Sequence, residues 1–406
     1  MNALNRYPRR PRVHWLVAFV VLAVWILGVL MISHASEPPP VLEKSFCCFN
    51  GVGGLAVDAE GNIYVGELFN HRIVKLGPDG STITTWATDR PGPFDVQVDG
   101  NGVVWVGSGT GPDNALHRYT SNGTLISLFT QFNSLFEFAF GPGGVVYVLD
   151  HHFGNVRKYS GDGTLITIWS LGGFAGGRPV GIAVDSNGLV YVGVAVGSFE
   201  TGEIRIYSPE GTLLGTVPNQ TRGGMLRIDS KDHLYQTVGT AAGTEVRKFT
   251  KSGEILWQIP GGQFFALALD AQGKVYVGDG EAPNSKIHIF AQVVEVAIDI
   301  KPGSFPNSIN PRSEGVIPVA ILTTDTFDAT TVDETTVLFG ATGTQATPVH
   351  FALEDVDGDG DTDMILHFNT QDTGIVCGDT SASLTGETFD GQMIEGSDSV
   401  KTAGCK

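Results

Sequence analysis

The sequence predicts an all-β protein in which a six-bladed β-propeller is followed by a C-terminal antiparallel β-sandwich. A unit of about 40–45 residues recurs six times between Gly51 and Phe290, which is typical of propeller blades built from short strands. The chain also holds 54 glycines, as many tight turns require. After residue 292 the period is lost, and short β-rich segments separated by Pro, Gly, Asn and Thr replace it.

A complete copy of the repeat predicts four strands around one aromatic anchor. The first copy predicts strands at residues 55–57, 63–65, 72–76 and 82–86, with turn residues between them. Successive anchors lie 41 to 44 residues apart; they are Tyr64, Trp105, Tyr147, Tyr191, Tyr235 and Tyr276. In the fifth copy, residues 229–233 lack the turn glycine that the other clear copies carry.

The sixth copy has no outer strand of its own, because the chain runs directly from Phe290 into Val293. A spare strand at residues 41–46 stands upstream of the first blade. Pairing it with the sixth blade would close the ring and remove an exposed edge, so we predict this closure.

The first 35 residues predict export. Four arginines precede an uncharged apolar run from Leu16 to Ile32, and Ser33 and Ala35 supply the small residues of a signal-peptidase site. The run has 17 residues, which is long for a signal and just long enough to span a bilayer. Residues 1–35 are therefore either a cleaved signal peptide or an N-terminal membrane anchor, and the rest of the chain is expected to be extracellular or on the cell surface.

Charge excludes one class of partner and marks a boundary. The formal net charge is −18, whereas proteins that bind nucleic acid need a basic surface. Residues 293–406 hold 19 acidic side chains against 4 basic ones, a much more acidic balance than in the repeats. We therefore place the propeller at residues 36–292 and a second domain at residues 293–406.

The four cysteines fall into two pairs. Cys377 and Cys405 lie in the C-terminal domain and are expected to form a disulfide in an oxidising compartment. Cys47 and Cys48 are adjacent, which makes a bond between them strained and uncommon. We expect them to be small buried residues of a strand, and the sequence leaves their redox state open.

Blade geometry brings the starts of the inner strands and the loops after the second strands to one face of the ring. Polar residues that the repeat places there form a candidate channel-mouth site: Glu67, Asp95, Glu137, Asp150, His151 and Asp279. Converging carboxylates can hold a hard cation such as Ca²⁺, which can act as a Lewis acid with His151 or His152 as a base. The alternative is a set of solvated acids, since the fourth and fifth blades carry Val194 and Val238 at the matching positions.

The C-terminal domain contains a loop with acids at alternate positions: Asp355, Asp357, Asp359, Asp361 and Asp363. Carboxylates this close repel one another unless a cation neutralises them, so the loop predicts calcium binding. The start fits an EF-hand, but Leu366 stands where that motif needs a bidentate Glu, and the flanks are strand-like. The loop is more similar to the calcium loop of integrin-type (FG-GAP-like) repeats. That resemblance implies that Asp363 completes the coordination shell of the ion and that Asp361 offers its backbone carbonyl.

The repeat also resembles a known family. The run from Gly54 to Ile73, with its Gly-Leu-Ala-Val-Asp, Gly-Asn-Ile-Tyr-Val and Asn-His-Arg-Ile segments, is similar to the NHL repeat of six-bladed propellers. That resemblance implies a platform that binds protein or RNA, while related six-bladed rings are metal-dependent lactonases and lyases. Residues 296–406 resemble a C-terminal module of exported microbial proteins, which implies extracellular attachment or stability.

These observations favour a non-catalytic platform that binds an extracellular protein or glycan at the cell surface or in the matrix, with a C-terminal module stabilised by calcium. The alternative is a metal-dependent hydrolase or lyase, similar to a lactonase, acting at the channel mouth. A purely structural spacer is the third hypothesis. Membrane contact is expected only through residues 1–35, if they are retained.

Overall fold

The computed structural model describes residues 38–405, except 109–113, 131, 133, 173–177, 197–200, 218–222, 241–242 and 281. The predicted export segment, residues 1–35, lies outside this part of the chain. Within the described residues no helix is long and apolar enough to cross a membrane.

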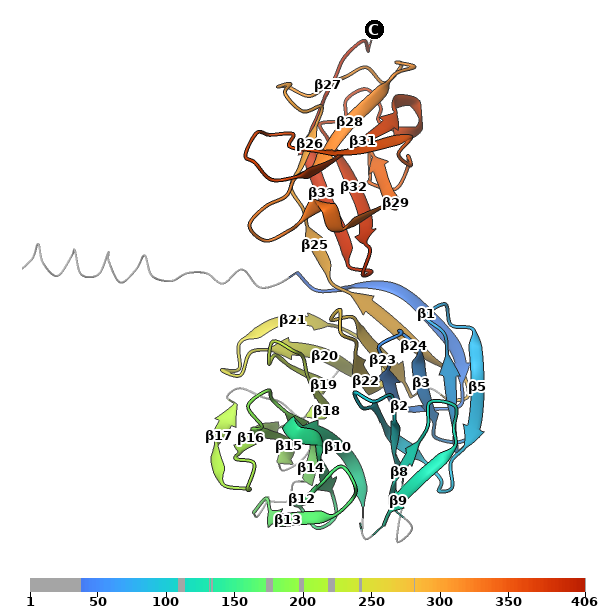
Figure 1. The fold of residues 1–406 in the computed structure, drawn as a ribbon, viewed down its shortest axis with the longest axis vertical. Helices are drawn as coiled ribbons and strands as arrows, with labels where there is room; N and C mark the ends of the chain where they lie inside the picture. Colours follow the sequence, from blue (N-terminus) through green and yellow to red (C-terminus); the bar gives the residue numbers. More distant parts are fainter. Residues whose placement is uncertain are drawn as a thin grey trace, which may run out of the picture. The chain divides into compact units, whose positions relative to one another are not determined.

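Six four-stranded antiparallel sheets form a ring (Figure 1), which confirms the predicted propeller. The first three blades contain, in order, β2 (Val52–Val57), β3 (Ile63–Glu67), β4 (Arg72–Leu76) and β5 (Thr82–Ala87); β6 (Pro93–Val98), β7 (Val104–Ser108), β8 (Ala115–Tyr119) and β9 (Leu125–Phe129); and β10 (Leu135–Gly141), β11 (Val145–Asp150), β12 (Asn155–Tyr159) and β13 (Leu165–Ser170).

The remaining blades contain β14 (Arg178–Val184), β15 (Val190–Val196), β16 (Thr201–Tyr207) and β17 (Leu213–Val217); β18 (Gly223–Ile228), β19 (Leu234–Thr240), β20 (Gly243–Phe249) and β21 (Ile255–Ile259); and β22 (Phe264–Leu269), β23 (Val275–Asp279) and β24 (Ser285–Ala291). The outer strand of the sixth blade is β1 (Val41–Phe49), which pairs antiparallel with β24 from Val41 opposite Ala291 to Phe49 opposite Ser285. The strand expected to close the ring therefore lies at that place.

The turn between the first two strands explains why Asp and an aromatic anchor recur together. Asp58 accepts hydrogen bonds from the backbone of Glu60 and Asn62 through Oδ1, and from the Tyr64 hydroxyl through Oδ2 at 3.0 Å. The same bond joins four further pairs: Asp99 to Trp105, Asp185 to Tyr191, Asp229 to Tyr235, and Asp270 to Tyr276. In the fifth blade Asp232 takes the left-handed conformation, with φ 63°, where the other clear copies have glycine.

Residues 293–405, which we call the C-terminal domain, contain two four-stranded sheets. One has the order β25 (Val293–Glu295), β33 (Met393–Ser399), β32 (Ser381–Thr388), β29 (Val332–Gly340); the other has the order β26 (Ile298–Ile300), β28 (Val316–Ile321), β31 (Asp363–Asn369), β30 (His350–Glu354). A short pair, β27 (Ser308–Ile309) with β34 (Lys401–Thr402), accompanies them. Apolar residues of both sheets share one cluster that includes Val319, Leu366, Phe339 and Leu384. Pairing is mostly antiparallel, but β25 with β33 and β27 with β34 are parallel, which the sequence analysis did not expect.

The cysteines differ from expectation in one pair. Cys377 and Cys405 are bonded, with their Cα atoms 5.8 Å apart. Cys47 and Cys48 are also bonded to each other, and both are exposed on β1. The prediction that both are buried is therefore wrong, and the bond settles the redox state that the sequence left open. The strand β1 is the outer strand of its blade, so its side chains meet solvent where an inner strand would bury them.

Candidate functional site

The sequence-predicted acids at the channel mouth already have protein partners; Glu67, Asp95, Glu137 and Asp150 are buried, and Asp279 is half-buried. Glu67 ends β3 and accepts hydrogen bonds from the Asn50 amide at 2.9 Å and from the side chains of Asn70 and Arg72. Burial works against the charge of Glu67, but these donors outweigh it and lower the pKa of its carboxyl. Asp150 pairs with Arg157 at 3.5 Å, and Asp279 lies 3.6 Å from His288 and accepts from the Lys286 amide.

Asp95 and Glu137 do come together, around a cation that the sequence analysis did not single out. Arg227 of the fifth blade donates to Asp95 of the second at 2.7 Å and to Glu137 of the third. Asp95 also accepts from the Phe138 amide at 3.0 Å, and Glu137 accepts from the Ile182 and Leu226 amides at 2.8 and 3.2 Å. These bonds cross from blade to blade, so the two carboxylates tie the inner strands together.

The two carboxylates of this triad are fully buried, and the Arg227 side chain is 12% exposed. Burial raises the pKa of Glu137 to about 8, with a smaller push from Asp95 and an opposing pull from Arg227. In turn Asp95 and Glu137 keep the pKa of Arg227 above its usual value in spite of its burial. A buried carboxylate engaged by amides and a guanidinium has little capacity left for a metal ion or a substrate.

His151 lies beside the mouth and has structural partners. Its Nδ1 is 2.7 Å from the Pro179 carbonyl, which can only accept, so the ring donates from Nδ1. The ring stacks on Phe136 with centroids 5.2 Å apart, and burial lowers the pKa of His151. His152 beside it is exposed. Neither histidine lies among the residues that line the cavity described next.

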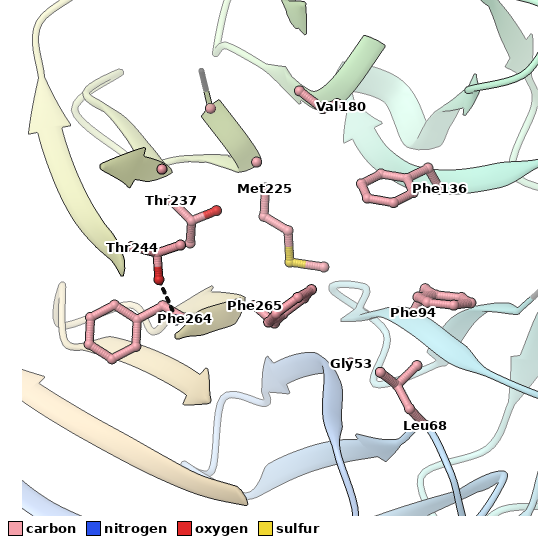
Figure 2. Close-up of a pocket in the computed structure, with 13 residues that line it drawn as sticks. Gly53, Leu68, Phe94, Phe136, Val180, Met225, Thr237, Thr244, Phe264 and Phe265 are labelled. Atoms are coloured by element: carbon pink, nitrogen blue, oxygen red, sulfur yellow. Dashed lines mark hydrogen bonds between the residues drawn. The ribbon is translucent and has the colours of Figure 1, made fainter. Parts of the chain in front are cut away.

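An apolar cavity of about 300 Å³ opens among the inner strands. Phe94, Phe136, Met225 and Phe265 point toward one another in it (Figure 2). Of its 13 lining residues only Thr237 and Thr244 carry polar side chains, and Thr244 Oγ1 already accepts from the Phe264 amide. We call this cavity the apolar mouth; its other lining residues are Gly53, Leu68, Val180, Gly223, Gly224, Gly239 and Phe264.

A repeated backbone feature builds the apolar mouth. In all six blades the register between the first and second strands shifts near the start of the inner strand. The residues left unpaired by these bulges all line the cavity; they are Gly53, Phe94, Phe136, Val180, Gly224 with Met225, and Phe265. A bulge re-aims a side chain, and here it turns each blade's contribution toward the centre of the ring.

The residues that line the mouth stand one position before those predicted from the repeat. Asp95 and Glu137 were predicted at the mouth, whereas the preceding residues, Phe94 and Phe136, line it. In a regular strand, neighbouring side chains point to opposite faces, so only one of two neighbours is expected at the mouth. The extra residue of the bulge changes which of the two that is. An aromatic residue at this position in three of six copies, with Phe265 as the third, was the available signal.

The acidic loop of the C-terminal domain is the other candidate site. Asp355, Asp357 and Asp363 can place one carboxylate oxygen each within 4.8 Å of the others, and within the described residues no other set of three His, Cys, Asp or Glu does so. Asp363 is buried, and its two oxygens accept from the Thr323 and Val356 amides at 2.8 and 2.9 Å. Asp359 and Asp361, also predicted as ligands, are not in this set; Asp359 accepts from the Asp361 amide at 2.9 Å.

Comparisons with known proteins concern the propeller fold. No protein-family model and no curated protein matches the sequence. Among solved structures, a streptogramin B lyase is similar at 12% identity and a TM-score of 0.48, over 60% of this chain and 98% of that one. A virginiamycin B lyase from Staphylococcus aureus has 14% identity and a TM-score of 0.44, over 61% and 99%. The WD40 propeller domain of Doa1 has 13% and 0.45, over 59% and 79%. At these values we carry no activity over to this chain.

Proposed function

We propose that this chain is an exported, NHL-type propeller that acts as a non-catalytic binding platform and takes an apolar side chain of an extracellular protein into its mouth. The observation that carries the proposal is the apolar mouth itself, to which every blade contributes a bulge residue. A concave apolar surface within a rigid ring is the usual form of a binding site. Phe265 is 59% exposed there, so its ring is available to a partner.

Binding fits the mouth better than the hydrolase or lyase alternative. Catalysis of that kind needs a base or a metal within reach of the substrate. The walls offer aromatic rings, Met225 and glycines, while Asp95 and Glu137 are held by amides and by Arg227. Nothing in this lining supplies a nucleophile beside a base.

A protein segment fits the mouth better than a glycan. Sugars stack on aromatic rings, but their hydroxyl groups also need hydrogen-bond partners in the same site, since unpaired polar groups are costly to bury. Two threonines offer little of this. An aromatic or large aliphatic side chain needs no hydrogen-bond partners. Its binding becomes more favourable as more of its apolar surface is removed from water.

Calcium and export belong to the same proposal. The buried Asp363 and the nearby Asp355 and Asp357 form an oxygen donor set of the kind that Ca²⁺ takes. Bound there, calcium would offset the mutual repulsion of the loop carboxylates and stabilise the C-terminal domain. Calcium sites of extracellular modules have dissociation constants of about 10⁻⁴–10⁻³ M, which suit extracellular calcium levels. Residues 1–35 would direct the chain to that compartment.

The test is a selection of displayed random peptides on the full chain, run beside a glycan array. We expect the selected peptides to share an aromatic or large aliphatic residue and to lose binding to a Phe265→Ser variant. Phe305→Ser removes a Phe that is 92% exposed in the C-terminal domain, so it is the matched control and should bind as the unchanged chain does. Glycan binding without peptide binding, or turnover of lactone or ester substrates that a chelator abolishes, would contradict the proposal.

A further inference from the structure

Two histidines of the C-terminal domain face each other on neighbouring strands. His350 of β30 lies directly opposite His367 of β31 in the antiparallel register, and the Val349 amide donates to the His367 carbonyl at 2.8 Å beside this pair. Directly opposed residues of an antiparallel pair have side chains on the same face of the sheet. The ring centroids are 5.5 Å apart, and the ring planes differ by 38°.

His367 is half-buried, and one of its two ring nitrogens has no hydrogen-bond partner among the described residues. This nitrogen, Nδ1, is itself buried. Buried ring nitrogens normally bond to something, because an unpaired polar atom away from water costs free energy. His350 is exposed, so the pair can be reached from solvent.

The surroundings of the pair favour a nitrogen ligand set. Across the register His367 also lies opposite Pro318, and the next pair on the same face of the sheet is Ala352 opposite Ile365. None of these neighbours offers a carboxylate. Imidazole suits Cu²⁺, Ni²⁺ and Zn²⁺, whereas Ca²⁺ takes oxygen ligands, so the acidic loop and this pair would select different cations.

We infer that His350 and His367 form a second cation site, in which one borderline divalent metal ion such as Cu²⁺ binds to a nitrogen of each ring. Two metal–nitrogen bonds of about 2.1 Å each are compatible with ring centres this close. Water molecules complete the coordination sphere, as they do in open metal sites. The strands β30 and β31 hold the two rings in place before the ion binds.

The test is a titration of the full chain with Cu²⁺ in saturating Ca²⁺, followed by calorimetry and by electron paramagnetic resonance. Outer partners of a metal site already change affinity by about 10- to 100-fold, so loss of a direct ligand should weaken this site by at least about tenfold. We expect this loss in His350→Ala and in His367→Ala alike, with fewer nitrogen couplings in the spectrum. His152→Ala removes an exposed histidine of the propeller and is the matched control.

Thermal melting without metal shows whether each variant is folded, and Cu²⁺ should raise the midpoint of the unchanged chain more than that of either variant. Unchanged affinity and unchanged nitrogen coupling in both variants would overturn the inference. An effect of one histidine alone would also overturn it, since that indicates a single imidazole ligand and no bridge between the strands.

Discussion

At the scale of single residues, two hydrogen-bonding roles of one aspartate explain why it recurs together with the aromatic anchor. One carboxylate oxygen closes the first turn of the blade, and the other accepts from the hydroxyl or indole N–H of the anchor. The repeat pattern contains both residues in each clear copy. It predicted a turn and an aromatic anchor, but not the hydrogen bond between them. The third blade has Gly141 where the others have Asp, so the hydroxyl of its anchor Tyr147 does not have this acceptor.

Replacing the turn aspartate should therefore destabilise the propeller. In Asp99→Ala the Trp105 N–H loses its acceptor at 2.8 Å, and the Asn101 and Val103 amides lose theirs. A buried donor without a partner costs about 1–3 kcal/mol, so the urea midpoint of Asp99→Ala should fall. The midpoint of Asp99→Asn should fall less, because one acceptor oxygen remains. Asp79→Ala, in an exposed outer turn where the partner is Ser81, should leave the midpoint nearly unchanged. Equal shifts in the two alanine variants would contradict this account.

At the scale of elements, the outer hairpin turns contribute to the contact between blades. Gly163 joins β12 to β13 with φ 93°, and a Cβ there would lie 1.8 Å from Phe129 of the preceding blade's outer strand. Gly80, Gly123 and Gly211 meet Phe46, Trp86 and Trp169 in the same way. The turn glycines recur in the sequence for two reasons, then: the left-handed backbone and the approach of the neighbouring blade.

A pair of glycine substitutions separates these two reasons. Gly163→Ala should cost about 1–2 kcal/mol for the backbone conformation and about 1–3 kcal/mol more for the clash with Phe129. Gly273→Ala has a similar φ of 82° but no atom within 4 Å of the added carbon, so it reports the backbone cost alone. Denaturant unfolding of both variants measures the difference. If Gly163→Ala lost no more stability than Gly273→Ala, the interblade contact would contribute nothing measurable.

The acidic loop is the element through which we propose that calcium stabilises the C-terminal domain. When the free concentration of an ion is 100 times its dissociation constant for the folded state, its binding adds about 2.7 kcal/mol to the free energy of unfolding. Chelation should therefore lower the melting midpoint of the full chain, and Asp357→Asn should reduce both this effect and the heat of calcium binding. Asp363→Asn should do the same, but it also disturbs two backbone bonds, which makes Asp357 the cleaner probe.

The control for the loop is Asp372→Asn, which changes an acid of the same domain that bonds to Asn369. It should leave calcium binding unchanged. Heat and melting shifts that persist in Asp357→Asn would place the calcium elsewhere, and an absence of heat in the unchanged chain would remove calcium from the proposed function.

At the scale of the whole molecule, periodicity predicted more than chemistry did. The spacing of the anchors from Tyr64 to Tyr276 gave the number of blades, because each blade repeats the same hydrophobic alternation. The mouth was missed because a bulge displaces Phe94 and Phe136 by one place, and the spacing of a repeat does not reveal a bulge. Arg227 was missed for another reason: its two carboxylate partners come from blades about 90 and 130 residues earlier, and only ring closure brings them together.

Ring closure itself provides the last prediction. A chain that begins at residue 50 lacks β1, so β24 loses its partner from Ala291 to Ser285 and the buried Ile287 and Ile289 lose cover on one side. We expect a lower melting midpoint and a tendency to associate through the free edge, measured by thermal melting and size-exclusion chromatography. A chain that begins at residue 38 keeps β1 and is the control. A peptide of residues 38–49, added to the shorter chain, should raise its midpoint again by pairing with β24. Equal midpoints for the two chains would mean that the ring is stable without its closing strand.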